Sequence, residues 1–529
     1  MIMIELRSFW CRNQKPHAQT ENKETDDVNM KETFRRFRES SWFKTLVEVR
    51  GLNVFYASLC VIDLFGVFPI VALPGALISC GYYGIPLLIF VLTLQIYTAV
   101  VLGRCWIIAE KLDPNIIQKK RTPYAAVAQL IYGRRMHIFV TIMLNITVFG
   151  AGIPNILVAS QNLQLIGSRI SNGEFSMSFC YWLIILGIFL CPIMWLGSPK
   201  HMKEIASVSV VTVLSVSILI WICIMEDDSI ASGSFSQIQL DQPDIENMLK
   251  VYGIIAFQFD IHPMLMTIEV DMQNKAKIGT AVCYGLMVTC ALSIVTTILA
   301  AYQYGTETES NVLQMLPRSN ILYGAILLVT VQLCLSHAVG SSALFQNIEE
   351  YLHIRKDFNI KRCILRSFII ALAVTIAELL PQFDLVMGII GGTLTGPLIF
   401  ILPPMFYHRL IRMEKEFDEN VQRESTTLMM ATNSDNENIN LLNNNEIEKL
   451  HKHRTKNGYG TFISQSTKFI RRQNLSLCFS GDAFICISVI IFGIFATITS
   501  TYFNLMTASS FTDFRSPCIQ NISFSFDEL

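Results

Sequence analysis

The chain has 529 residues, of which 52% are hydrophobic and 16% charged, and its formal net charge is −1. This composition excludes a soluble multidomain enzyme and indicates a polytopic membrane protein. A net charge near zero gives no sign of a nucleic-acid partner. The sequence contains no glycine-rich phosphate loop and no paired-cysteine metal motif, so we expect no cofactor or metal.

The chain begins with a polar arm of mixed charge over residues 1–50, which we expect to be disordered, cytosolic and without a cleavable secretory signal. Eleven apolar segments follow, and each is long enough to cross a bilayer as a helix. They cover residues 53–79, 85–109, 137–167, 180–197, 204–225, 249–270, 280–302, 320–347, 364–380, 385–407 and 482–505. The predicted fold class is therefore an all-α polytopic membrane protein with eleven transmembrane helices.

The distribution of Lys and Arg predicts the orientation. With the N-terminus in the cytosol, the outer segments hold only Arg169, Arg318 and Arg515, while nearly all other basic residues lie inside. This is the positive-inside pattern. The tail over residues 508–529 is then extracellular or luminal, and Asn521, which begins an Asn-Ile-Ser sequon, is a glycosylation site.

A long polar segment, residues 408–480, separates the tenth span from the eleventh helix, for which we predict residues 481–507. It contains the low-complexity run NSDNENINLLNNNE, so we expect a flexible cytosolic insertion that cytosolic partners can bind. Near the outer face, Cys80, Cys180 and Cys518 allow one disulfide, and the sequence does not select a pair.

The sixth span carries polar and helix-breaking residues at mid-depth, namely Gln258, Asp260, His262 and Pro263. A charged group at the bilayer centre costs at least ~2.5 kcal/mol, and proline removes a backbone donor. These residues must face protein, water or a ligand, so we expect an interrupted helix that lines a solute site. The alternative is a kinked helix with a buried polar contact.

The first span has the same character. Asp63 is followed closely by Gly66, Pro69 and Pro74, which make a continuous helix difficult. Corresponding broken helices in two halves of a chain indicate the central site of a transporter. The alternative is a chance occurrence of proline, which is frequent in membrane helices.

Spans one and six are five apart, which predicts a ten-helix transporter core over residues 51–407. Its two inverted halves would be residues 52–225 and 249–407, and the eleventh helix would lie outside this repeat.

Several short motifs occur in order along the core. They include Leu73-Pro74, Gly81-Tyr82-Tyr83-Gly84, Arg104-Cys105-Trp106, Gln161-Asn162-Leu163, His262-Pro263, Asn311-Val312-Leu313 and the stretch from Gly391 to Pro404. Their order and spacing resemble the amino acid/auxin permease family, which includes vesicular inhibitory-amino-acid, proton-coupled and sodium-coupled amino acid transporters. The resemblance implies the fold of the bacterial leucine transporter, with broken first and sixth helices that hold the substrate. One departure is that Val67 and Pro69 replace the usual Gly-x-Gly pair, with Gly66 one place earlier.

An amino acid at the breaks would place its carboxylate on unpaired N–H groups and its ammonium on exposed carbonyls. The predicted substrate-binding residues are Phe68, Pro69, Ile70, Phe257, Gln258 and Phe259.

Asp63, Asp260 and His262 are the candidates for proton coupling, because buried carboxylic acids and imidazoles exchange protons near neutral pH. For each, the alternative is a structural hydrogen bond at a broken helix. Ser336, Ser341 and Ser342 in the eighth span indicate a sodium site instead, because sodium-coupled relatives bind the ion between the first and eighth helices. Small polar residues also let helices pack closely.

The predicted function is secondary active transport of amino acids, coupled to protons, by alternating access around broken helices one and six. The alternatives are a sodium-coupled transporter and a membrane amino acid sensor on the same scaffold. An enzyme is not expected, because no nucleophile–base or metal constellation recurs across the spans. The expected partners are an amino acid and the lipid bilayer, in the plasma membrane or in a lysosomal or vesicular membrane.

Overall fold

The computed structural model describes residues 51–119, 122–170, 177–195, 202–227, 244–354, 359–436 and 479–510. The predicted N-terminal arm, most of the predicted extracellular or luminal tail, including Asn521, and most of the predicted insertion lie outside these ranges. From Leu52 onward, the described residues belong to one compact unit. They are almost entirely helical, apart from one isolated β-bridge between Leu52 and Met272.

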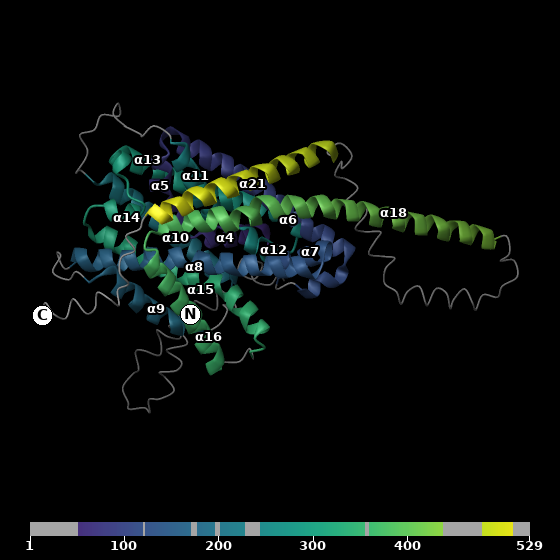
Figure 1. Cartoon of the computed structure of the whole chain (residues 1–529), viewed down its shortest axis with the longest axis horizontal. Helices are drawn as coiled ribbons and strands as arrows, with labels where there is room; N and C mark the ends of the chain where they lie inside the picture. Colours follow the sequence, from purple (N-terminus) through teal and green to yellow (C-terminus); the bar gives the residue numbers. More distant parts are fainter. Residues whose placement is uncertain are drawn as a thin grey trace, which may run out of the picture. The chain divides into compact units, whose positions relative to one another are not determined.

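The first part of this unit is a set of helices (Figure 1). Its α-helices are α4 (Val54–Phe65), α5 (Phe68–Ser79), α6 (Gly84–Leu112), α7 (Pro123–Tyr132), α8 (Arg134–Ile170), α9 (Phe179–Trp195) and α10 (Met202–Met225). Two 3₁₀ turns connect them, η1 (Gly81–Tyr83) and η2 (Pro114–Lys119).

The second part contains nine further α-helices. They are α11 (Ile245–Gln258), α12 (His262–Val270), α13 (Ile278–Tyr304), α14 (Val312–Met315), α15 (Asn320–Tyr351), α16 (Ile360–Leu379), α17 (Phe383–Ile390), α18 (Leu402–Asn436) and α21 (Phe479–Ser510). The connecting segments include the 3₁₀ turns η4 (Lys275–Lys277) and η5 (Gly305–Glu307) and the π-helical segments η6 (Gly391–Thr395) and η7 (Pro397–Ile401).

Each of the eleven predicted spans overlaps a helix. By length and composition, eight described helical segments could cross a membrane, or nine if the bent pair α4 and α5 counts as one span. Helix α9 is apolar but shorter, and α16 carries Lys361, Arg362 and Arg366 near its start. The structure therefore supports a multi-pass membrane protein, while the count of eleven crossings is not confirmed.

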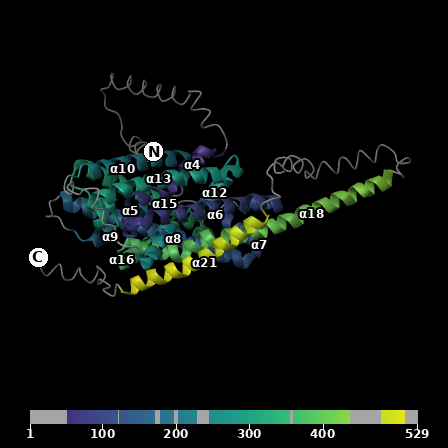
Figure 2. The same ribbon diagram turned by 90° about the horizontal axis from the view of Figure 1, so that it is seen from above.

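Packing places the two interrupted helix pairs inside the bundle. Helix α13 packs on both α4 and α5, α8 packs on α15, and α11 contacts α5, α6 and α17. Helix α21 lies along α11, α17 and the π-helical segments, and both views show it on the outside of the bundle (Figures 1 and 2). The centre is thus built from broken helices, and continuous helices surround it.

The predicted boundary at residue 407 is corrected by α18, which continues to Asn436, so the segment predicted as a flexible insertion over residues 408–480 begins with a helix. No glycine or proline follows Pro404 in this helix, and Glu, Lys, Arg and Met are good helix formers. Two carboxylates of α18 hold Lys111 of α6, at 2.9 and 2.8 Å. Beyond these contacts, the helix extends past the rest of the bundle (Figure 2).

The cysteines predicted near the outer face are distinguished by the structure. Cys180 is disulfide-bonded, Cys80 is free, and Cys518 lies outside the described ranges. Every other described cysteine is free.

Candidate functional site: a cavity between two helix breaks

The break between α4 and α5 occurs at Gly66 and Val67. Gly66 has φ 57° and ψ −143°, a conformation that favours glycine, and its N–H closes α4 on the carbonyl of Ile62 at 3.0 Å. Helix α5 begins at Phe68 with Pro69 in its first turn, where no backbone donor is needed. The two helices are bent by 58° at this point.

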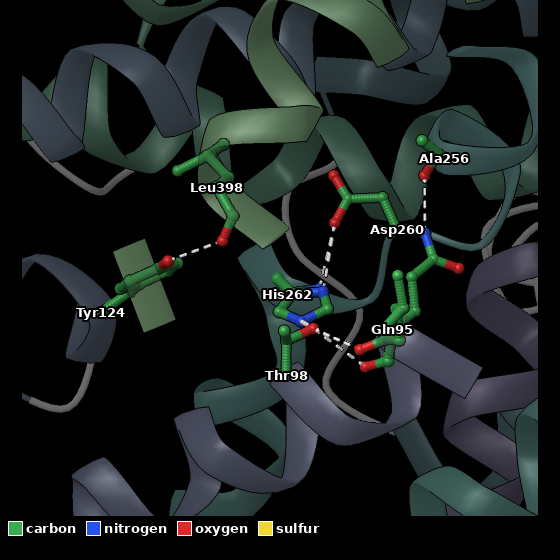
Figure 3. Close-up of polar contacts among 8 residues, drawn as sticks. Gln95, Thr98, Tyr124, Ala256, Asp260, His262 and Leu398 are labelled. Carbon is green, nitrogen blue, oxygen red and sulfur yellow. Dashed lines mark hydrogen bonds and ion pairs between the residues drawn. The ribbon is translucent and has the colours of Figure 1, made fainter. Parts of the chain in front are cut away.

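The second break separates α11 from α12 and comprises residues 259–261, although the two helices stay within 40° of one line. Here the N–H of Asp260 bonds to the carbonyl of Phe257 at 3.2 Å, three residues back instead of four. The carbonyl of Ala256 therefore loses its helical donor. The Nε2 of Gln95 on α6 donates to that carbonyl at 3.0 Å (Figure 3). The break is thus completed by a side chain from a neighbouring helix.

A cavity of about 160 Å³ lies at the two breaks, and residues of α4, α5, α8, α11, α12 and α15 line it. Its volume is well below the ~300 Å³ at which sites for drug-sized ligands begin, which favours a small solute. The predicted site residues that line it are Asp63, Phe68, Phe257, Gln258, Asp260, Ser336 and Ser341. The two breaks, far apart in the sequence, therefore share one internal space.

Other predicted site residues do not line this cavity but are buried near the breaks or lie on α15. Ile70 and Phe259 are fully buried, and the Phe259 ring packs on Phe65 with centroids 5.6 Å apart. The carbonyl of Pro69 accepts a hydrogen bond from Ser293 Oγ of α13 at 2.9 Å. Ser342 is half-buried on α15 and is not among the lining residues.

Two buried polar side chains of the cavity wall each have an oxygen without a hydrogen-bond partner among the described residues. Gln258 is 5% exposed and directs Nε2 at the sulfur of Met387 (3.8 Å), while its Oε1 has no hydrogen bond. The Oγ of Thr147 on α8 is likewise buried and without a partner. An unsatisfied buried polar atom costs ~1–3 kcal/mol, so a polar solute that bonds these atoms is favoured.

His262 forms the inner wall of the second break and connects Asp260 to α6 (Figure 3). It is 0% exposed, its Nε2 lies 3.0 Å from Thr98 Oγ1, and its Nδ1 lies 3.7 Å from Asp260 Oδ1. Thr98 can donate to the carbonyl of Leu94 at 3.1 Å, which leaves its oxygen to accept from His262 Nε2. Asp260 Oδ1 also accepts the main-chain N–H of His262 at 3.2 Å, so the carboxyl group and the imidazole form one polar contact at the second break.

Several functional candidates were missed from the sequence. Thr147 and Asn155 line the cavity from α8, a helix with no break to single it out. Gln95 and Thr98 are buried on α6, and the signal that could have found Gln95 is a polar amide within an apolar span. Among the described residues, no group of three or more His, Cys, Asp or Glu side chains could hold a metal ion.

Sequence comparisons agree with one another. The family model "Transmembrane amino acid transporter protein" matches residues 52–432. "Amino acid transporter AVT1C" of Arabidopsis thaliana is 23% identical over 386 residues, which are 71% of this chain and 64% of that protein. The "Vesicular inhibitory amino acid transporter" of Homo sapiens is 24% identical over 361 residues, 65% of this chain and 66% of that protein. The chain thus spans just under two thirds of the length of both relatives, which are named as transporters and not as enzymes.

Solved structures give weaker similarities. The crystal structure of MhsT in complex with L-phenylalanine has a TM-score of 0.46 and 10% identity, covering 69% of this chain and 97% of that one. A manganese transporter of Eremococcus coleocola has a TM-score of 0.42 and 14% identity, covering 88% of this chain and 97% of that one. These TM-scores are too low to support conclusions about the site.

Proposed function

Because the chain belongs to the family of transmembrane amino acid transporter proteins, we propose that it carries amino acids across a membrane through the cavity between its two interrupted helices. The family predicted from the sequence is confirmed by the match over residues 52–432. The observation that carries the proposal is the convergence of unpaired polar groups on a small internal cavity at both breaks.

The break at Gly66 supplies groups that suit an amino acid. The main-chain N–H groups of Val67 and Phe68 belong to residues that line the cavity. They lie at the N-terminal end of α5, where the helix dipole favours a carboxylate. The carbonyls of Leu64 and Phe65 lie at the C-terminal end of α4, where the helix dipole suits an ammonium group, and both residues line the cavity.

Proton coupling is supported by the carboxylates of the cavity wall. Asp63 and Asp260 both line the cavity, and Asp260 contacts His262, which is sealed against α6. A proton bound by the Asp260–His262 pair would change the charge next to a solute in the cavity, and so change the affinity for that solute. One proton that moves through 100 mV supplies about 2.3 kcal/mol, enough to concentrate a solute.

Alternating access would require the interrupted pairs to move as corresponding parts of two inverted halves. The start of α4 is bound to the end of α12: Leu52 N–H donates to Asp271 O at 2.8 Å, and Gln273 N–H donates to Leu52 O at 2.9 Å. This bridge joins the two broken pairs on one side of the cavity. In the proposed cycle it separates when the cavity opens to that side, which by the charge pattern is the cytosol.

Sodium coupling is the second candidate, and one observation favours it. A Cβ placed on Gly66 would lie 3.3 Å from Ser336 Oγ, so this hydroxyl lies beside the first break. Ser341 also lines the cavity. Hydroxyl and carbonyl oxygens are ligands that a hard cation accepts.

The deciding experiment is uptake of a panel of labelled amino acids into proteoliposomes, with and without an inward proton gradient and with and without sodium. Wild type, Asp63→Asn and Asp260→Asn are compared. Saturable uptake that depends on the proton gradient in wild type, and loses that dependence in both variants, supports the proposal. Dependence on sodium alone supports the second candidate. Thermal stabilisation by an amino acid without any flux would indicate a sensor.

A further inference from the structure

A second buried acid lies away from the cavity, on the helix that follows the second break. Glu269 on α12 is 0% exposed, and neither Oε1 nor Oε2 has a hydrogen-bond partner among the described residues. It does not line the cavity. The proposed transport mechanism does not use it, and a structural role in hydrogen bonding is excluded by its unbonded oxygens.

The surroundings of Glu269 are formed by α6 and the turn after α12. A Cβ placed on Gly103 of α6 would lie 3.5 Å from Oε2, so the carboxyl group lies against α6 at this position. The ionisable groups that interact with it are Glu110 and Cys105 of α6 and Lys275 of η4. Among these, Lys275 is the one cation.

Lys275 is already engaged in this conformation. Its Nζ is in a close ion pair with Glu110 Oε1, and both side chains reach solvent, being 25% and 19% exposed. A carboxylate at Glu269 would therefore be buried without a counterion, which is far more costly than burial of the neutral acid. This arrangement requires the protonated form of Glu269.

We propose that Glu269 is a second proton-binding site, loaded in this conformation and emptied when Lys275 moves from Glu110 to Glu269. In that step the O–H bond of Glu269 breaks, the proton passes to water, and the carboxylate pairs with the ammonium of Lys275. Glu110 stays ionised and gains solvent in place of its partner. The step requires α12 and α6 to separate at the end where the β-bridge holds the two broken pairs together.

The role in transport rests on the proposed proton coupling, whereas the proton on Glu269 is a property of the resting protein. Infrared spectroscopy of the purified full-length protein without substrate tests the latter. The spectra are recorded at neutral pH, well above the pH of ~4.3 at which exposed glutamates ionise. The difference spectrum, wild type minus Glu269→Gln, should then show the carbonyl band of a protonated carboxylic acid. Asp260→Asn serves as the matched control, because it retains this band. A wild type without the band overturns the proposal.

The ion-pair exchange has its own test in Glu110→Gln. This variant frees Lys275 to neutralise Glu269, so the band disappears at lower pH than in wild type. An unchanged titration overturns the exchange. Glutamine has the same shape as glutamate, and the side chains of Glu110 and Lys275 both reach solvent, so the fold is expected to persist.

Flux measurements then separate the two proposals. Glu269→Gln permanently mimics the protonated form of Glu269. We expect this variant still to exchange the labelled amino acid that wild type carries best across the membrane. It should no longer accumulate that amino acid when a proton gradient is applied. Accumulation equal to that of wild type overturns a role for Glu269 in coupling. If amino acid uptake by wild type does not depend on the proton gradient, the proposed proton coupling is wrong, while the infrared result for Glu269 remains valid.

Discussion

Gln95 Nε2 donates a hydrogen bond of 3.0 Å to the main-chain carbonyl of Ala256, across the interface between α6 and α11. That carbonyl is unpaired within its own helix because the chain breaks at residues 259–261. In a membrane no solvent replaces such a donor, so an interrupted helix depends on its neighbours for its unpaired groups. The relationship explains how the second break is tolerated inside the bundle.

Gln95→Leu should therefore destabilise the protein by about 1–3 kcal/mol, because it leaves a buried carbonyl unsatisfied. Thermal unfolding in lipid nanodiscs measures the loss. Thr93→Val on the same helix is the control, since its hydroxyl bonds only to Ile89 O on the exposed face and should change stability little. Equal unfolding temperatures for Gln95→Leu and wild type would contradict this account of the break.

Gly66→Ala tests the first break. The φ of 57° and ψ of −143° at Gly66 are unfavourable for a residue with a side chain, and the added Cβ would also lie 3.3 Å from Ser336 Oγ. We expect a loss of about 1–3 kcal/mol from backbone strain. In contrast, Gly324→Ala on the exposed face of α15 meets no atom within 4 Å and should be neutral or slightly stabilising. Similar effects of the two substitutions on the unfolding temperature would show that the Gly66 conformation is not required.

Much of this arrangement could be predicted from the sequence, because prolines, glycines and acids in a hydrophobic segment are costly unless they serve a site. Asp63 and Gly66, and Asp260 with Pro263, located both breaks, and all four line the cavity. Which residues face the cavity could be predicted only in part, because in a broken helix the facing side depends on the bend and on the neighbouring helices. Phe259 illustrates this limit. Its neighbours in the sequence, Gln258 and Asp260, both line the cavity, whereas Phe259 itself is buried in the core.

The helix boundaries show a second limit of the sequence. The end of the tenth span was placed where hydrophobicity ends, but a helix continues wherever its residues favour it and contacts support it. Polar residues after residue 407 extend α18 to Asn436, and its ion pairs with Lys111 fasten the extension to α6. A hydropathy pattern therefore predicts which part of a helix lies in the membrane, but it does not predict where the helix ends.

Glu349→Gln should destabilise the protein by about 3–5 kcal/mol, because it leaves a buried guanidinium without its counterion. Arg366 is 1% exposed and donates from Nε to Glu349 Oε1 at 2.6 Å. Glu419→Gln removes an ion pair to Arg423 that is 3.9 Å long and largely exposed, so it should cost less than ~1 kcal/mol. Chemical denaturation of both variants distinguishes them, and comparable losses would contradict a structural role for the buried pair.

The most direct measurement of the central claim is saturable amino acid uptake by Gly340→Phe and Gly324→Phe, two substitutions on α15. A Cβ at either position meets no atom within 4 Å, but Gly340 lines the cavity and Gly324 does not. If the cavity carries the substrate, Gly340→Phe fills it and reduces uptake to background, while Gly324→Phe transports like wild type and both unfold at the wild-type temperature. Wild-type uptake by a folded Gly340→Phe protein would contradict transport through this cavity.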